Sequence, residues 1–239
     1  MTFTRENRQP SLSPEFGFLM KTKPKKRWEV RWHQVLTKEE LAQITVANAL
    51  AKEEALKTND RSTIIEWMIL NTSLWGLRIS ESAHLKCGQV FLGENAAHLD
   101  LRITKGGKPR DVFIGPVFAT FLTEYLAWKK TVGDPVDANA PFFLSKRTGD
   151  CMTAEGLRKA FKRAVHRGIE RKVTPHAGRH TLGTHMSRVD LKMVQKILGH
   201  SSLATTEVYA HVLNPHIQEF VEQYETLLYA ALKENGQKP

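Results

Sequence analysis

Residues 174–181 read TPHAGRHT, and residues 198–209 read LGHSSLATTEVY. Their chemically active side chains, in chain order, are His176, Arg179, His200 and Tyr209. Imidazole and guanidinium groups can surround a phosphodiester. A phenol becomes a nucleophile at neutral pH only where nearby cations favour the phenolate. The two segments, which we expect on short helices, therefore predict part of a site that attacks a phosphate, with Tyr209 as the attacking group.

The two histidines of residues 174–181 also suggest a metal site. His176 and His180 lie four residues apart, which would place both imidazoles on one helix face, as a zinc site requires. However, no glutamate lies between them to act as a base, and Arg179 would repel a cation. The only two cysteines, Cys87 and Cys151, cannot complete a structural zinc site alone. We therefore predict no metal.

The other half of the site is predicted about 100 residues upstream. Arg78 follows a strongly apolar segment, and Arg179 lies within another, so each guanidinium needs an anion. Glu81 could satisfy Arg78 as an internal ion pair, which is a purely structural interpretation. Alternatively, both arginines bind a phosphate whose oxygens gain charge during the reaction. Lys105, on a glycine-rich turn, could protonate the leaving oxygen.

Apolar periodicity predicts a mainly helical α+β domain with one small antiparallel hairpin. The body begins at Leu36, where Thr37 and Glu40 fit a capping box. We expect helices over residues 37–56, 62–74, 117–130, 153–167 and 216–233, a helical turn over 77–85, and strands over 98–103 and 111–114. The chain thus divides into a basic arm (1–35), a body (36–215) and a C-terminal helix (216–239).

Composition favours an anionic partner. The 239 residues carry a formal charge of +10, and the arm alone holds eight basic against three acidic residues. We rank nucleic acid above anionic lipid, since no apolar run reaches the roughly 18 residues of a membrane span. Two cysteines and no signal-peptide pattern indicate a reduced intracellular protein. The arm is either solvated or ordered on DNA, where it would follow the phosphates.

Five separated motifs resemble the tyrosine recombinase, or phage integrase, family. They are GLRISE (76–81), Lys105 in KGGK, HAGRHT (176–181), LGHSS (198–202) and TTEVY (205–209), and they span roughly residues 36–215. The resemblance implies that family's catalytic-domain fold and a chemistry that needs neither metal nor ATP. It assigns Arg78 and Arg179 to clamping the scissile phosphate, His176 to acid–base assistance and His200 to a hydrogen bond with the phosphate. Lys105 would protonate the 5′ oxygen, Tyr209 would form a 3′-phosphotyrosine link, and Glu81 would orient the site.

The resemblance also implies double-stranded DNA as substrate, a tetrameric synapse, accessory DNA-bending proteins, and a cytoplasmic, nucleoid-associated protein of bacterial, phage or plasmid origin. Two basic surfaces are candidate DNA contacts, although plain solvated charge would explain both. They consist of Lys25, Lys26 and Arg27 in the arm, and Arg158, Lys159, Lys162, Arg163 and Arg167 on the helix over 153–167. The C-terminal helix would dock on a neighbouring protomer or pack on its own chain.

One departure from the family pattern affects the expected activity. Family members usually carry a helical core-binding domain ahead of the catalytic domain, whereas only about 35 residues precede Leu36 here. Three alternatives remain: strand relaxation of the type IB topoisomerase kind, a DNA-binding regulator without productive recombination, and a metal-dependent nuclease. The complete set of candidate catalytic residues argues against the regulator.

Overall fold

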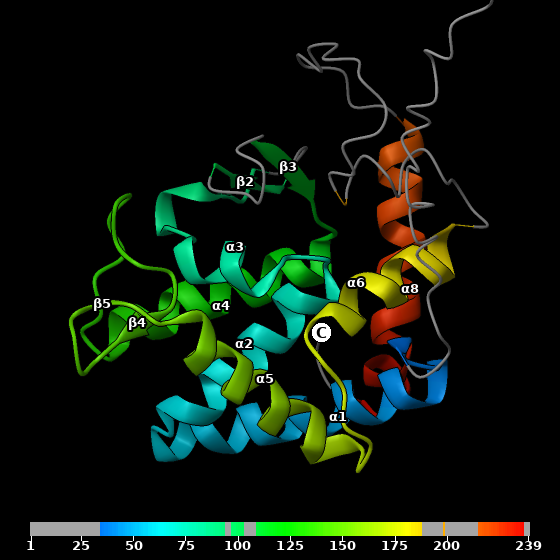
Figure 1. Ribbon diagram of the computed structural model, residues 1–239, viewed down its shortest axis with the longest axis horizontal. Helices are drawn as coiled ribbons and strands as arrows, with labels where there is room; N and C mark the ends of the chain where they lie inside the picture. The colour runs from blue at the N-terminus through cyan, green and yellow to red at the C-terminus, as the bar shows by residue number, and fades with distance from the viewer. Residues whose placement is uncertain (1–33, 94–96, 103–108, 188–197, 199–214, 237–239) are drawn as a thin grey trace, which may run out of the picture.

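The computed structural model describes residues 34–93, 97–102, 109–187, 198 and 215–236, and its central element is helix α2 (Arg61–Leu74). Residues 64–74 are all buried, as expected for a segment that is apolar on more than one face. Five helices pack around α2: α1 (Lys38–Thr58), α3 (Ile79–His84), α4 (Pro116–Thr131), α5 (Ala154–Gly168) and α6 (His176–Met186) (Figure 1), and the C-terminal helix also hydrogen-bonds to it. Each of these helices agrees with a predicted helical segment to within a few residues.

The start of α1 has the predicted capping box. The amide of Glu40 donates to Thr37 Oγ1 at 3.2 Å, and the amide of Thr37 donates to Glu40 Oε2 at 2.9 Å. At its middle, α1 packs against the last turn of α5, where a Cβ on Gly168 would lie 2.6 Å from the Cα of Ile44. This backbone-to-backbone approach fixes α5 on α1, because any larger residue would separate the two helices.

Two small antiparallel sheets complete the body. The first has the order β1 (Val90–Phe91), β2 (His98–Leu101) and β3 (Arg110–Phe113), and β2 and β3 are the predicted hairpin. The second pairs β4 (Leu144–Ser145) with β5 (Asp150–Cys151), and the sequence pattern did not predict it. Strands of two residues are too short to show alternation, so periodicity could not reveal β1, β4 or β5.

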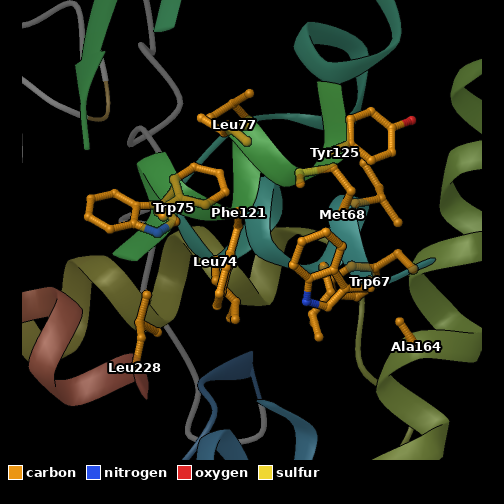
Figure 2. Packing of buried hydrophobic residues seen from close by; sticks show 14 of the residues in the cluster. Trp67, Met68, Leu74, Trp75, Leu77, Phe121, Tyr125, Ala164 and Leu228 are labelled. Carbon is orange, nitrogen blue, oxygen red and sulfur yellow. The ribbon is translucent and has the colours of Figure 1, made fainter. Parts of the chain in front are cut away.

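An aromatic cluster joins the end of α2 to α4 and to the C-terminal helix α8 (Pro215–Glu234) (Figure 2). Trp75 stacks on Phe118 with ring centroids 5.4 Å apart and meets the edge of Tyr224 at 5.5 Å. Its indole Nε1 donates to the hydroxyl of Tyr229 at 3.2 Å. Helix α8 therefore packs on its own chain here, also along α1. Docking on a neighbouring protomer stays a prediction.

Neither a membrane-spanning helix nor a metal-binding cluster occurs among the described residues. No described helix combines the length and the apolar character that crossing a membrane requires. Across the same residues, no group of three or more histidine, cysteine, aspartate or glutamate side chains is placed to hold a metal ion. The arm residues Lys25, Lys26 and Arg27, together with the turn that includes Lys105, lie outside the described part of the chain.

Candidate active site

The turn between α2 and α3 places Arg78. Gly76 takes the left-handed conformation with φ +83°, which an L side chain rarely adopts, and this reverses the chain just after α2. Arg78 then occupies the N-cap position of α3. Its amide donates to Glu81 Oε2 and its guanidinium to Glu81 Oε1, both at 2.7 Å. The ion pair that the sequence left as one of two interpretations is therefore present.

Glu81 has a second cationic partner that the sequence did not reveal. Arg110, at the start of β3, donates from a guanidinium nitrogen to Glu81 Oε2 at 2.8 Å, and the carboxylate is fully buried. Burial opposes ionisation, but the charge of Arg110 and the hydrogen bonds from Arg110 and Arg78 hold the pKa of Glu81 below its usual value. The carboxylate is thus an anion shared by two guanidiniums from different elements.

Arg179 reaches the same place from α6. Its side chain is buried and donates to the backbone carbonyl of Leu198 at 2.6 Å and to that of Gly76. Burial, with Arg78 and Arg110 close by, lowers the pKa of this guanidinium. Helix α6 can approach closely because Gly178 packs directly on the backbone carbonyl of Ser73 at the end of α2.

Two guanidiniums of this cluster, those of Arg78 and Arg110, bind the carboxylate of Glu81, and the third, that of Arg179, binds backbone carbonyls beside it. Among the residues that the structure describes, three positive charges against the one negative charge of Glu81 leave an excess of two, in a region where Arg179 and Glu81 are buried. Backbone carbonyls supply hydrogen-bond acceptors but no compensating charge. Such a cluster favours a further anion, and planar guanidiniums bind phosphate oxygens through paired hydrogen bonds.

Two histidines of α6, His176 and His180, flank Arg179 in the chain. His176 is the first residue of the helix and is exposed, and its ring centroid lies 6.5 Å from that of the half-buried His180. Burial, followed by the charges of His176 and Arg179, lowers the pKa of His180. The lowered pKa favours the neutral form of His180, whereas His176 is open to solvent. Lys105, His200 and Tyr209 fall outside the described residues.

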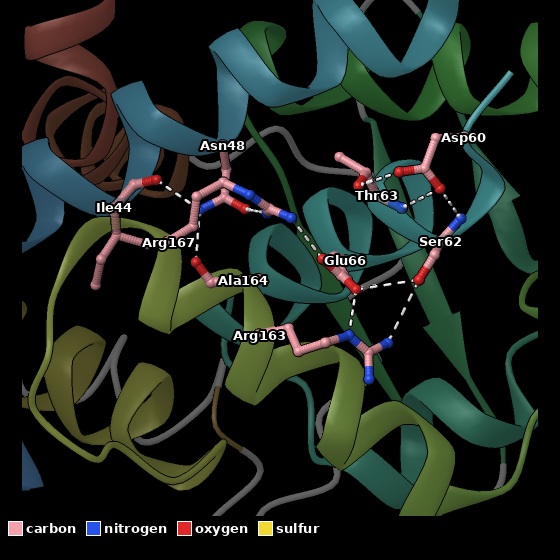
Figure 3. A network of polar contacts seen from close by, with 9 residues as sticks. All are labelled: Ile44, Asn48, Asp60, Ser62, Thr63, Glu66, Arg163, Ala164 and Arg167. Carbon is pink, nitrogen blue, oxygen red and sulfur yellow. Dashed lines mark hydrogen bonds and ion pairs between the residues drawn. The ribbon is translucent and has the colours of Figure 1, made fainter. Parts of the chain in front are cut away.

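The basic face of α5 divides into two groups. Arg163 and Arg167 both bind the buried carboxylate of Glu66, and Arg167 also donates to Asn48 Oδ1 at 2.5 Å (Figure 3). These two guanidiniums therefore connect α5 to α2 and α1, a role that their charge alone did not reveal.

The rest of the face is open to solvent. Lys159 and Lys162 are exposed, and Arg158 is half exposed in a pair with Glu155. A hollow of about 550 Å³ lies at the C-terminal end of α5. Its basic lining residues are Lys162, Arg163, His166, Arg167, Arg171 and Lys172. The charges on this side of the molecule thus extend from the helix into the following loop.

Comparisons with known proteins point to one family. The phage integrase family matches residues 34–216. The tyrosine recombinase XerC of Ralstonia pickettii is 34% identical over 197 residues, which cover 75% of this chain and 59% of that protein. XerD of Listeria innocua is 31% identical over 180 residues, covering 72% and 59%. The chain therefore spans about three fifths of the length of these relatives.

Solved structures confirm the expected fold. The crystal structure of the XerA recombinase has a TM-score of 0.55 at 24% identity, covering 80% of this chain and 64% of that one. The XerH site-specific recombinase bound to its difH substrate, in a pre-cleavage complex, has a TM-score of 0.53 at 26% identity, covering 71% and 47%. The mainly helical catalytic-domain fold with a small antiparallel sheet is thus established.

Proposed function

Since the chain belongs to the phage integrase family, we propose that it is a site-specific tyrosine recombinase, which cuts and rejoins double-stranded DNA. The observation that carries the proposal is the cluster of Arg78, Arg110 and Arg179 around the single carboxylate of Glu81. Its excess positive charge suits a phosphodiester, whose non-bridging oxygens gain charge as the phosphorus is attacked. Such fixed cations can stabilise that charge without a metal ion.

In the proposed reaction, Arg78 and Arg179 clamp the scissile phosphate. The phenolate of Tyr209 attacks phosphorus, the bond to the 5′ oxygen breaks, and a 3′-phosphotyrosine link forms. Lys105 supplies the proton to the departing 5′ oxygen, while His176 exchanges protons and His200 hydrogen-bonds the phosphate. Attack by the 5′ hydroxyl of another strand reverses these steps, so bond energy is conserved throughout.

The exposed part of α5 is the proposed DNA-backbone contact, with Arg158, Lys159 and Lys162 at its centre. The arm residues Lys25, Lys26 and Arg27 would add further phosphate contacts. Lys159→Ala and Lys162→Ala should each reduce the salt dependence of binding to random-sequence duplex DNA by about one unit of log K against log salt. Lys57→Ala removes the same charge from the exposed end of α1 and is the control. Equal slopes for all four proteins would exclude this contact.

The proposed working form is a tetramer on two DNA sites, in the cytoplasm on nucleoid DNA, with accessory DNA-bending proteins where a site needs them. Helix α8 packs along α1 of its own chain in this structure. In the tetramer, the same helix would dock on a neighbouring protomer, an exchange of an identical element that requires no new kind of contact.

The proposal is tested with nicked random-sequence duplexes, in which the short strand 3′ to the cut is lost after cleavage, so that covalent protein accumulates. Wild-type protein should yield adducts on a denaturing gel, with and without EDTA, and sequencing the captured DNA identifies the site. Tyr209→Phe should bind DNA and form none. An adduct in that variant would refute the nucleophile, and binding without any wild-type adduct would favour a regulator. Loss of cleavage in EDTA would favour a metal-dependent nuclease.

A further inference from the structure

Arg110 is the charged residue of the candidate site that no family motif quoted above contains. It is the first residue of β3, opposite Leu101 of β2, and its side chain is only 9% exposed. The guanidinium donates to Glu81 Oε2 at 2.8 Å and to the carbonyl of Gly76 at 3.4 Å. One side chain therefore links the sheet to α3 and to the turn that follows α2.

The acceptors of Arg110 are the same atoms that orient the phosphate-clamping arginines. Glu81 Oε2 also accepts the amide of Arg78, while Oε1 of that carboxylate holds the Arg78 guanidinium. The carbonyl of Gly76 also accepts a hydrogen bond from Arg179. Arg110 thus contacts an anchor of Arg78 and an anchor of Arg179.

Loss of Arg110 would alter the anchor of Arg78 first. The charge of Arg110 is the largest influence that keeps the buried carboxylate of Glu81 ionised. Without it, Glu81 would retain the amide and guanidinium of one residue only, and a buried carboxylate that is short of donors turns or becomes protonated. Either change would release the Arg78 guanidinium from its present direction.

The position of Arg110 in the chain adds a second link. Residues 102–109 connect β2 to β3, and Lys105 lies in this connection. Arg110 follows it directly, so the hydrogen bond to Glu81 joins the end of the connection to the arginine cluster. Strand β3, which follows the proposed proton donor Lys105 in the chain, is therefore hydrogen-bonded through Arg110 to Glu81, the residue that orients Arg78.

We propose that Arg110 is a positioning residue, which holds Glu81, and through it Arg78, in the geometry that clamps the scissile phosphate. The expected effect on the cleavage rate rests on the proposed function, whereas the expected effect on the position of Arg78 does not. Arg110 itself does not contact DNA in this proposal. Its replacement should consequently change the rate of strand cleavage and leave DNA affinity nearly unaltered.

The test uses Arg110→Met, which preserves side-chain length and apolar packing, and Arg110→Lys, which restores the charge. Single-turnover cleavage of the trapping duplex at saturating protein should slow about 100-fold in Arg110→Met, the loss expected of a group displaced by about 1 Å. Affinity for the duplex should stay within about threefold of wild type. Arg110→Lys should recover about tenfold of the loss, because the ammonium keeps the positive charge and can still donate to Glu81 but lacks the planar fork.

Arg102→Met is the matched control. Arg102 directly follows β2, its side chain is 66% exposed, and it pairs with Asp100. The variant should cleave at the wild-type rate. Urea unfolding of every variant shows whether a slower protein is simply less folded. A rate within threefold of wild type for folded Arg110→Met would overturn the proposal, as would a loss of DNA affinity that accounts for the whole defect.

A crystal structure of Arg110→Met separates this inference from the proposed function. The expected result is an Arg78 guanidinium that no longer lies within hydrogen-bond distance of Glu81 Oε1. An Arg78–Glu81 contact retained at 2.7 Å, as in the present structure, would refute the positioning role whatever the activity. If wild-type protein forms no covalent adduct, the proposed function fails, and the position of Arg78 in the variant still decides the role of Arg110.

Discussion

Gly178→Ala tests the contact that brings Arg179 into the candidate site. A Cβ at residue 178 would lie 2.2 Å from the carbonyl oxygen of Ser73 and 2.6 Å from its carbon, both backbone atoms at the end of α2. Backbone cannot rotate away as a flexible side chain can. The whole of α6 must therefore move away from α2, and the residue next to the substitution is Arg179.

The size of this movement follows from the contact distances. An ordinary contact begins near 3.4 Å, so the shortfall from 2.2 Å requires a shift of about 1.2 Å. The hydrogen bond from Arg179 to Leu198, now 2.6 Å, would lengthen to as much as about 3.8 Å and be lost. Overpacking of this kind costs about 1–3 kcal/mol of stability. A displacement of about 1 Å in a phosphate-binding group slows the reaction about 100-fold.

Urea unfolding and single-turnover adduct formation on the trapping duplex measure the two effects separately. Gly183→Ala is the matched control on the same helix, since among the described residues its Cβ would meet only Leu198 Cδ1, at 3.7 Å. That variant should be active and about 0.5–1 kcal/mol more stable, because alanine favours a helix interior. Equal stability and equal rates for the two variants would refute the close packing of α6 on α2.

Two further predictions concern stability. Tyr229→Phe removes the hydroxyl that accepts a hydrogen bond from Trp75 and donates one to Asn71 Oδ1 at 2.8 Å. It should lower the free energy of unfolding, measured by urea unfolding, by about 1–3 kcal/mol. A loss below about 0.5 kcal/mol would contradict this pairing. Hydrogen bonds from Arg171 hold the pKa of Glu40 below its usual value, so the stability from this pair should be complete above pH 4.5 and disappear as the pH falls through the lowered folded-state pKa. Glu40→Gln keeps the capping box but should flatten this acid loss, and an unchanged pH profile would refute it.

Local signals were sufficient to predict most of the fold. The capping box of Thr37 and Glu40 lies within four residues, and the apolar content of residues 64–74 identifies a buried helix without knowledge of its neighbours. The same reasoning fails for β4 and β5. Their four residues show no periodicity, and their pairing depends on the turn between them rather than on an apolar face.

The site was predicted only as far as its motifs are local. Arg78 and Glu81 are three residues apart, so their ion pair was one of two interpretations that the sequence allowed. Arg110 pairs with Glu81 across 29 residues of sequence, and Arg163 pairs with Glu66 across 97. At such separations the sequence does not show whether a basic side chain is paired with a carboxylate or solvated. Tertiary packing alone determines which arginines are engaged by buried carboxylates and which remain for a ligand.

The end of α2 holds both of the helices that flank Tyr209 in the chain, α6 before it and α8 after it. In α6, Gly178 packs on the backbone of Ser73, and Arg179 donates a hydrogen bond to the carbonyl of Gly76. After Tyr209, α8 returns to the end of α2, where the hydroxyl of Tyr224 donates to the carbonyl of Leu74 at 2.6 Å. Exchange of α8 between protomers, as proposed for the tetramer, would leave the phosphate clamp on one chain and transfer the second anchor of Tyr209 to its neighbour. Cleavage by an exchanged protomer would then depend on its neighbour, whereas the single chain described here supplies both anchors itself.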